Sequence, residues 1–380
     1  MKALALLCAA AFLVILDAQI VLVAIPSIGA SMHFPPGAVQ WVLSAYGLAF
    51  GGLLLPAGRA ADLVGRRRAF MAGVALFTLS SLACGLPWSW EVLVAARVAQ
   101  GVSAAIMSPA ALAILMTTFA EGPARNRALG VWGSMGGLGG TAGALIGGLL
   151  TAGLGWQWIF LVNVPIGVAL LALSPLVLRE SRAAVRGPLV PLRIFRSRAF
   201  VGGNAVTLCA GMAAYGQGFL LSKHAQDDLG YSALQFGLVT ALLPISAVVG
   251  SVLGQHLVTR AGFRAVAAAS MALIGVACLL LVGGDLFPGV LVFGPGLGAG
   301  SVAASIAALS GVAERDAGLA SGFQTAAFQV GGALGVALVS AVSVLRGYGP
   351  AFGMEAGFAL LGVLAALVLL ADTLNRTRSS

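Results

Sequence analysis

Charged side chains are scarce in this sequence. Asp, Glu, Lys and Arg make up 9% of its 380 residues, whereas they make up about 25% of an ordinary soluble domain. Apolar residues make up 59%, and the mean hydropathy is +1.02. A soluble fold with so few charges could not cover its surface with polar groups. The composition therefore excludes a soluble protein and predicts an all-α integral membrane protein.

Residues that build enzyme and metal sites are also few. The four cysteines lie in apolar segments without metal-ligand spacing, and neither a G-x-x-x-x-G-K-[ST] motif nor a nucleophilic triad occurs. We therefore expect no disulfide, metal, cofactor or enzymatic activity. The net charge of +9 is spread over short loops, so it does not indicate a nucleic-acid partner. Energy for any active transport would have to come from an ion or solute gradient.

Apolar segments of membrane-spanning length fill most of the chain. A bilayer core requires about 20 apolar residues per helix. The sequence predicts twelve spans, at about 5–28, 38–58, 69–87, 91–118, 128–153, 158–178, 199–221, 234–257, 265–283, 288–310, 318–344 and 353–372. The first begins like a signal peptide, but its apolar run is too long for one. We therefore expect an uncleaved spanning helix there.

The basic residues indicate which side of the membrane each loop faces. If the amino terminus is cytoplasmic, 18 of the 21 basic residues fall on the inward side. Lys223 and Arg346 then fall outside, and Arg97 lies within a span. Basic residues favour cytoplasmic loops. The alternation predicts a multi-pass protein of the cytoplasmic (inner) cell membrane with both termini in the cytoplasm. We expect a monomer in the lipid bilayer.

The longest loop divides the spans six and six. We predict an amino-terminal six-helix bundle at 1–180, a cytoplasmic linker at 181–198 and a carboxyl-terminal six-helix bundle at 199–380. A repeat supports this division, because spans five and eleven match at an offset of 192 residues. The matched pairs are Ala128 with Ala320, Gly130 with Gly322, Gly139 with Gly331, Gly140 with Gly332 and Gly143 with Gly335. Parallel halves of this kind occur in secondary transporters.

Two ionisable residues lie inside predicted spans, Asp17 in the first and Arg97 in the fourth. Placing either type at a helix centre costs about 2.5–3.5 kcal/mol, so each must be paired or face water. In the functional interpretation Asp17 titrates, and Arg97 pairs with it or with substrate. The alternative is a fixed ion pair that holds two helices together. Gln100 follows Arg97 by three residues on about the same helix face.

Other polar residues inside the spans can line a cavity or join helices by hydrogen bonds. We assign to a substrate cavity Gln19, Tyr46, Gln100, Asn204, Tyr215, Gln217, Gln324 and Gln329. We expect no mid-membrane charge in the second half, so the cavity suits a lipophilic, neutral or weakly cationic substrate. The fifth span is rich in glycine, and we assign Gly143, Gly147 and Gly148 to close helix packing.

A charged turn joins the second and third spans, and it has a partial copy after the eighth. In the copy Thr259, Gly262 and Arg264 take the places of Asp62, Gly65 and Arg67, so the carboxylate is missing.

Four segments together carry a family resemblance. They are Gly58-x3-Asp62-x2-Gly65-Arg66-Arg67, the first-span segment Leu16–Pro26, Arg97-Val98-Ala99-Gln100-Gly101, and Gly143–Gly148 followed by Gly155–Gly167. In these motifs, and along nearly the whole chain, the sequence resembles the major facilitator superfamily. More narrowly, it resembles the fourteen-helix drug:proton antiporter group of that superfamily.

The resemblance implies proton-driven efflux of drugs by alternating access, and with it antibiotic resistance. It implies a major facilitator fold, a small-molecule substrate, and protons bound through Asp17 and Arg97. It also implies a cytoplasmic gate latch in which Asp62 caps a helix or pairs across the halves. The gate residues are Gly58, Asp62, Gly65, Arg66 and Arg67.

Three features depart from the group's pattern. Ala144 stands where the fifth-span signature has proline, and Lys223, Asp227 and Asp228 make one outer loop unusually charged. The two extra helices between the halves are missing. Two alternatives stay open: a facilitator or importer of a small solute with the same fold, and a transport-inactive membrane protein acting as a receptor or partner subunit.

Overall fold

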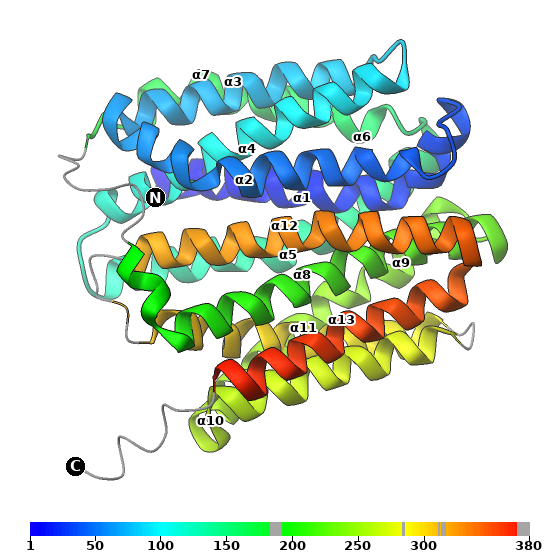
Figure 1. Cartoon of the computed structure of the whole chain (residues 1–380). Helices are drawn as coiled ribbons and strands as arrows, with labels where there is room; N and C mark the ends of the chain where they lie inside the picture. The colour runs from blue at the N-terminus through cyan, green and yellow to red at the C-terminus, as the bar shows by residue number, and fades with distance from the viewer. Residues whose placement is uncertain (183–191, 283–285, 311, 313–316, 371–380) are drawn as a thin grey trace, which may run out of the picture. The chain divides into compact units, whose positions relative to one another are not determined.

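The computed structural model describes residues 1–182, 192–282, 286–310, 312 and 317–370. Every regular element among these residues is helical (Figure 1). This confirms the prediction of an all-helical fold. The predicted linker 181–198 is described only at 181–182 and 192–198, and the last residues of two predicted spans, 283 and 371–372, lie outside the described residues.

The chain forms two compact units, of which unit 1 comprises Met1–Leu189 and Ala225–Ala241. Its helices are α1 (Lys2–Ser31), η1 (Ala38–Gln40), α2 (Trp41–Val64), α3 (Arg66–Gly85), α4 (Trp90–Thr118), α5 (Pro123–Gly153), α6 (Trp158–Leu161), α7 (Asn163–Val177) and α9 (Ala233–Thr240). Within the unit, α4 packs against α2 and α3, and α3 also contacts α7 (Figure 1). Helix α5 lies between α1 and α9. The sequence did not predict that α9 would group with the first bundle.

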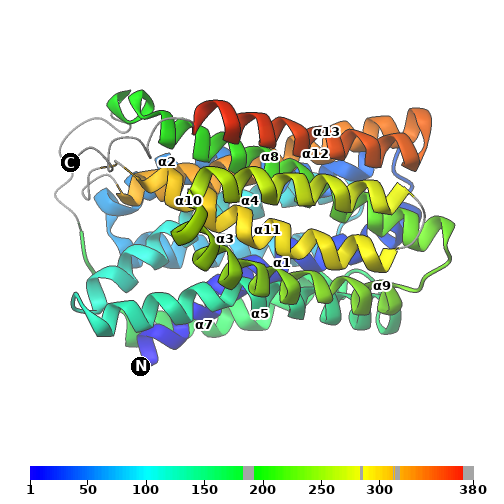
Figure 2. The same cartoon turned by 90° about the horizontal axis from the view of Figure 1, so that it is seen from below.

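Unit 2 comprises Val190–His224 and Leu242–Ser380. Its helices are η2 (Leu192–Arg196), α8 (Arg198–Lys223), α10 (Leu242–Val282), α11 (Leu286–Leu309), α12 (Ala317–Arg346) and α13 (Tyr348–Leu369). A π-helical turn, η3 (His224–Asp228), follows α8, and its residues from Ala225 onward belong to unit 1. Helix α8 packs against α12 and α13, and α10 packs against α11 and α13 (Figure 2). The core of the unit consists mostly of small side chains from these helices, such as Cys209, Ala303 and Ala359.

Eleven helical segments among the described residues are long and apolar enough to cross a membrane. One of them, Ala233–Val282, has 50 residues and corresponds to the predicted eighth and ninth spans together. Gly262 interrupts its helical geometry with φ 80° and ψ 156°. The predicted sixth span consists of α6 and α7, which follow each other within Trp158–Val177.

Many large apolar side chains point outward. Leu79, Leu176 and Val368 are 65%, 81% and 65% exposed. A monomeric soluble protein rarely presents wide apolar patches to water. With the length of the helices, this surface is the one that a lipid bilayer covers.

The glycine repeat marks equivalent helix contacts in the two units. At Gly143 of α5, an added Cβ would lie 3.1 Å from the carbonyl oxygen of Leu16 in α1. At the matched Gly335 of α12, an added Cβ would collide with the carbonyl oxygen of Met212 in α8. The same pairing of helices therefore occurs within each unit, α5 with α1 and α12 with α8.

Candidate functional site

A polar cluster lies inside unit 1 at the meeting point of five helices. Its members come from α1 (Asp17), α3 (Ser81 and Cys84), α4 (Arg97 and Gln100) and α7 (Asn163), and the backbone of α2 contributes as well. All six side chains are 0% exposed. We call this set the Asp17 cluster.

Asp17 accepts hydrogen bonds from three side chains. Arg97 Nη1 lies 2.6 Å from Oδ2, while Asn163 Nδ2 and Gln100 Nε2 lie 2.9 Å and 3.2 Å from Oδ1. Charge-assisted bonds of this length are the strong ones. Both oxygens of the carboxylate therefore accept hydrogen bonds from protein side chains, and the structure brings the two predicted ionisable residues together.

Arg97 is held from several sides. Its Nε donates to the carbonyl oxygen of Val42 at 2.8 Å, and its Nη1 also donates to Gln100 Oε1 at 2.7 Å. The guanidinium carbon lies 4.4 Å from the ring centroid of Tyr46 and 5.7 Å from that of Phe160. Aromatic faces attract a cation, so these rings replace part of its lost hydration.

Gln100 connects the ion pair to α3. Its Nε2 donates to Ser81 Oγ at 2.8 Å, and its Oε1 lies 3.2 Å from Cys84 Sγ. A buried pair of charges is stable only when hydrogen bonds satisfy its remaining polar atoms. Chains of such bonds strengthen one another in a low-dielectric interior. The network therefore links side chains of α1, α3, α4 and α7 with the backbone of α2.

The charged turn between α2 and α3 forms the second group of predicted residues. Gly65 separates the two helices with φ 122° and ψ 128°. Arg66 Nε donates to Asp62 Oδ1 at 2.7 Å. Gly58 lies one turn earlier on α2, where an added Cβ would be 3.3 Å from Pro109 of α4.

Glu180, at the end of the sixth span, caps α3. Its Oε1 accepts from the backbone amide of Arg67 at 3.0 Å, and its Oε2 accepts from that of Arg68 at 3.3 Å. A helix amino terminus favours an anion, because its first amide groups have no partner within the helix. The expectation that Asp62 would cap the helix was therefore wrong: Asp62 pairs with Arg66, and Glu180 provides the cap.

Substituting Gly65 with alanine is expected to destabilise unit 1. The positive φ disfavours any Cβ by about 1–3 kcal/mol, and the Cβ would lie 2.8 Å from Glu180 Oε1. Gly122→Ala is a matched control, since Gly122 has φ 106° but nothing within 4 Å of an added Cβ. In thermal unfolding of the purified protein, Gly65→Ala should lower the Tm more than Gly122→Ala. Equal shifts would show that the Glu180 cap contributes nothing.

The residues predicted to line a substrate cavity form separate groups. Gln100 belongs to the Asp17 cluster, Tyr46 packs its ring against Arg97 of that cluster, and Gln19 is half-buried on α1. In unit 2, hydrogen bonds join Tyr215 to Gln329 at 3.0 Å and Gln324 to Thr207 at 3.3 Å, and Asn204 bonds to the backbone of its own helix. Neither side-chain polar atom of Gln217 has a hydrogen-bond partner among the described residues. The structure thus brings α8 and α12 together through these residues.

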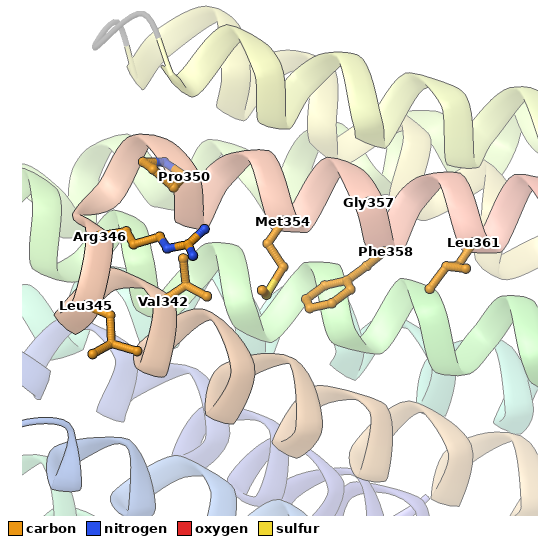
Figure 3. A pocket seen from close by; sticks show the side chains of 8 residues that line it. All are labelled: Val342, Leu345, Arg346, Pro350, Met354, Gly357, Phe358 and Leu361. Atoms are coloured by element: carbon orange, nitrogen blue, oxygen red, sulfur yellow. The ribbon is translucent and has the colours of Figure 1, made fainter.

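A cavity of about 650 Å³ lies elsewhere, between α12 and α13 (Figure 3). Met354, Phe358 and Leu361 of α13 line it, with Arg346 at one end. No residue of the predicted substrate cavity lines it. Among the described residues, no three His, Cys, Asp or Glu side chains are grouped as metal ligands.

The predicted packing glycines of α5 lie where other helices approach most closely. At Gly143 and Gly147 an added Cβ would lie 2.8 Å and 3.0 Å from side-chain atoms of Gln19 and Ile20 in α1. At Gly148 it would lie 2.9 Å from the carbonyl oxygen of Ala233 in α9. Larger side chains would therefore separate these helices.

Sequence reasoning missed three polar residues. Asn163 lies inside a quoted motif, and this was the available signal for its contact with Asp17. Glu180 is the acidic residue in an arginine-rich loop, and nothing in its neighbourhood along the sequence marks it as a helix cap. Glu355 of α13 is 0% exposed, so the second half buries an ionisable side chain that the sequence analysis did not single out. Its position near the predicted start of a span concealed its burial.

Comparison with known proteins places these features in a family. The Major Facilitator Superfamily model matches residues 7–202 and 203–380. The chain is 36% identical to the cephamycin export protein CmcT of Amycolatopsis lactamdurans, across 90% of this chain and 84% of that protein. It is 34% identical to the puromycin resistance protein pur8 of Streptomyces alboniger, across 88% and 80%.

A solved structure has the same fold. A bacterial homolog of the human lysosomal transporter Spinster, in an inward-facing and occupied conformation, matches with a TM-score of 0.81 at 16% identity, across 98% of this chain and 97% of that one. That likeness concerns the fold. The family model and relatives confirm a multi-pass membrane transporter rather than an enzyme. The chain is a member of the Major Facilitator Superfamily.

Proposed function

We propose that this chain is a proton-driven exporter of small amphipathic compounds that works by alternating access. The Asp17 cluster carries this proposal. It holds the one titratable carboxylate of α1, sealed from water and bound to a cation. A proton can reach it only if the helices separate, and a proton on Asp17 weakens its bond to Arg97. Protonation and helix movement therefore depend on each other, as antiport requires.

The names of the relatives support an amphipathic substrate. Proteins 36% to 32% identical to the chain are described as a cephamycin export protein, a puromycin resistance protein and a lincomycin resistance protein. We propose that Tyr215, Gln217, Gln324 and Gln329, with Gln19 and Asn204, contribute to the substrate path. Few charges accompany these amides and hydroxyls, which favours lipophilic, neutral or weakly cationic compounds.

We propose twelve membrane crossings with both termini in the cytoplasm, in a protein that works as a monomer. The break at Gly262 supports this number. The 50-residue segment Ala233–Val282 would be about 75 Å long as one helix, more than twice the hydrocarbon thickness of about 30 Å. The alignment with the cephamycin exporter spans 414 positions, more than the 380 residues here. That relative therefore contains residues without a counterpart, as expected if this chain lacks a central helix pair.

We propose that the α2–α3 turn is the cytoplasmic gate and that its partial copy is not. In the copy, Thr259 bonds to the backbone of its own helix and Arg264 to the carbonyl oxygen of Leu367. Asp62→Asn should therefore slow transport severalfold, whereas Thr259→Ala should leave it near wild type. The Asp62–Arg66 pair is partly exposed and contributes at most about 1 kcal/mol to stability, so the Tm should change little. Equal impairment by both substitutions would contradict a gate in the first half.

Reconstitution tests the function. The purified protein is placed in liposomes, a pH gradient is imposed, and the flux of fluorescent dyes and antibiotics is followed. Antiport predicts that the gradient accelerates the flux. An ionophore, which collapses the gradient, should then slow it. Flux that ignores the gradient would indicate a facilitator instead. No flux across a broad panel would favour a receptor or partner subunit.

A further inference from the structure

Helix α13 contains a buried carboxyl group that the Asp17 cluster does not use. Glu355 lies seven residues after the helix begins at Tyr348, about 10 Å along its axis. The residue is 0% exposed. It belongs to unit 2, so it is separate from the acid in α1.

The carboxyl lies in a narrow space between α13 and its neighbours. An added Cβ at Gly216 of α8 would lie 2.9 Å from Glu355 Oε1 and 3.5 Å from Val339 of α12. The weakly polar thiol of Cys278 in α10 lies beside it. Glu355 is therefore enclosed by α8, α10 and α12, which pack against α13.

Neither oxygen of Glu355 has a hydrogen-bond partner of good geometry among the described residues. Asp17 provides the contrast, because it is equally buried but has three donors and a cation. An ionised carboxylate that is buried without partners is disfavoured by several kcal/mol, whereas the neutral acid is much less so. This site therefore suits a carboxylic acid better than a carboxylate.

The charged groups of α8 and α12 lie at the ends of these helices, and those of α10, Arg260 and Arg264, lie beside its break at Gly262. Just after the end of α8, the ring centroid of His224 lies 5.1 Å from that of Tyr348, with the rings tilted, and 6.2 Å from that of Phe352, in an edge-to-face arrangement. Phe352 precedes Glu355 by three residues, on about the same face of α13. Lys223 and His224 have other interactions, and Arg346 ends α12. Cys278 of α10 is thus the titratable group that faces the carboxyl itself.

We propose that Glu355 is a second proton-binding site, located in unit 2 and protonated in this conformation. When α13 moves away from Gly216 and water enters, the O–H bond breaks and the proton passes to a water molecule. The carboxylate that remains is stable only in that hydrated state. The role of this step in transport rests on the proposed proton-driven function, but the protonation itself does not.

Infrared spectroscopy of the full chain in lipid nanodiscs tests the protonation. At neutral pH the wild type should show the C=O absorption of a buried protonated carboxyl, and Glu355→Gln should lose it. Glu121→Gln is the matched control, because the side chain of Glu121 is 86% exposed. Absence of the band in the wild type, or its persistence in Glu355→Gln, would overturn the proposal. If Glu355→Gln does not fold, Gly216→Ala should shift the band by crowding Oε1, and an unshifted band would count against the site.

Flux measurements in liposomes test the coupling. Gradient-driven flux should fall severalfold in Glu355→Gln, while exchange without a gradient is preserved. Glu355→Asp should restore part of the loss. If the wild type responds to the gradient and Glu355→Gln responds equally, this inference fails alone. If the wild type ignores the gradient, the proposed antiport fails, and the infrared band still decides whether Glu355 holds a proton.

Discussion

Arg97→Ala is expected to abolish transport and to destabilise the protein by about 3–5 kcal/mol, the usual result of removing one partner of a buried ion pair. Asp17 would then be left without its cation in an interior where its side chain is 0% exposed. The packing of Tyr46 and Phe160 against the guanidinium would also be lost. Thermal unfolding in detergent measures the stability, and dye flux in liposomes measures transport.

A double substitution separates structure from function. Asp17→Asn with Arg97→Gln removes both charges and keeps polar groups in the cluster. It should recover much of the lost stability, because no unpaired charge remains, but it should not recover gradient-driven transport. A double variant that transports like the wild type would show that the ion pair only holds α1 and α4 together. The pair lies in one hydrogen-bond network, so the single effects should not add.

Asp17→Asn should uncouple transport from the pH gradient. Asparagine keeps an oxygen to accept from Arg97 and has nearly the shape of aspartate, but it cannot exchange a proton. Flux in liposomes should therefore become equal with and without a gradient, and the pH dependence that the wild type owes to Asp17 should disappear.

Asn163→Ala is a suitable companion to that variant. It removes the 2.9 Å hydrogen bond to Asp17 Oδ1 and leaves the carboxylate and its cation in place. Gradient dependence should persist in this variant, even if the rate falls. Loss of the dependence in Asn163→Ala but not in Asp17→Asn would reject Asp17 as the proton carrier.

The membrane fold could be predicted from composition and length because lipid restricts the backbone so strongly. Uncharged runs of about 20 residues allow little besides helices. Asp17 and Arg97 could be singled out for the same reason, since a charge in such a run needs a partner. The sequence left open whether Arg97 pairs with Asp17 or with substrate. The structure was needed to show that the two residues pair with each other.

Other features depend on tertiary contacts that no local pattern contains. Glu180 caps a helix that begins 114 positions earlier in the sequence. No local pattern distinguishes an acidic residue that caps a distant helix from any other acidic residue in a basic loop. The grouping of α9 with α5 depends on the close approach of Gly148 to Ala233. Glu355 resembled a residue at the end of a span, because sequence alone locates such ends only to within a few residues.

The cap formed by Glu180 also bears on how this protein could change length during evolution. Glu180 and Ser181 bind the first amides of α3 where the predicted linker begins, and the carbonyl oxygen of Ser181 accepts from Arg66 at 2.9 Å. The end of the first six spans is thereby anchored to its own unit. Residues inserted or deleted after position 182 would leave this anchor intact. A gene could therefore gain or lose a segment there without refolding the α2–α3 turn.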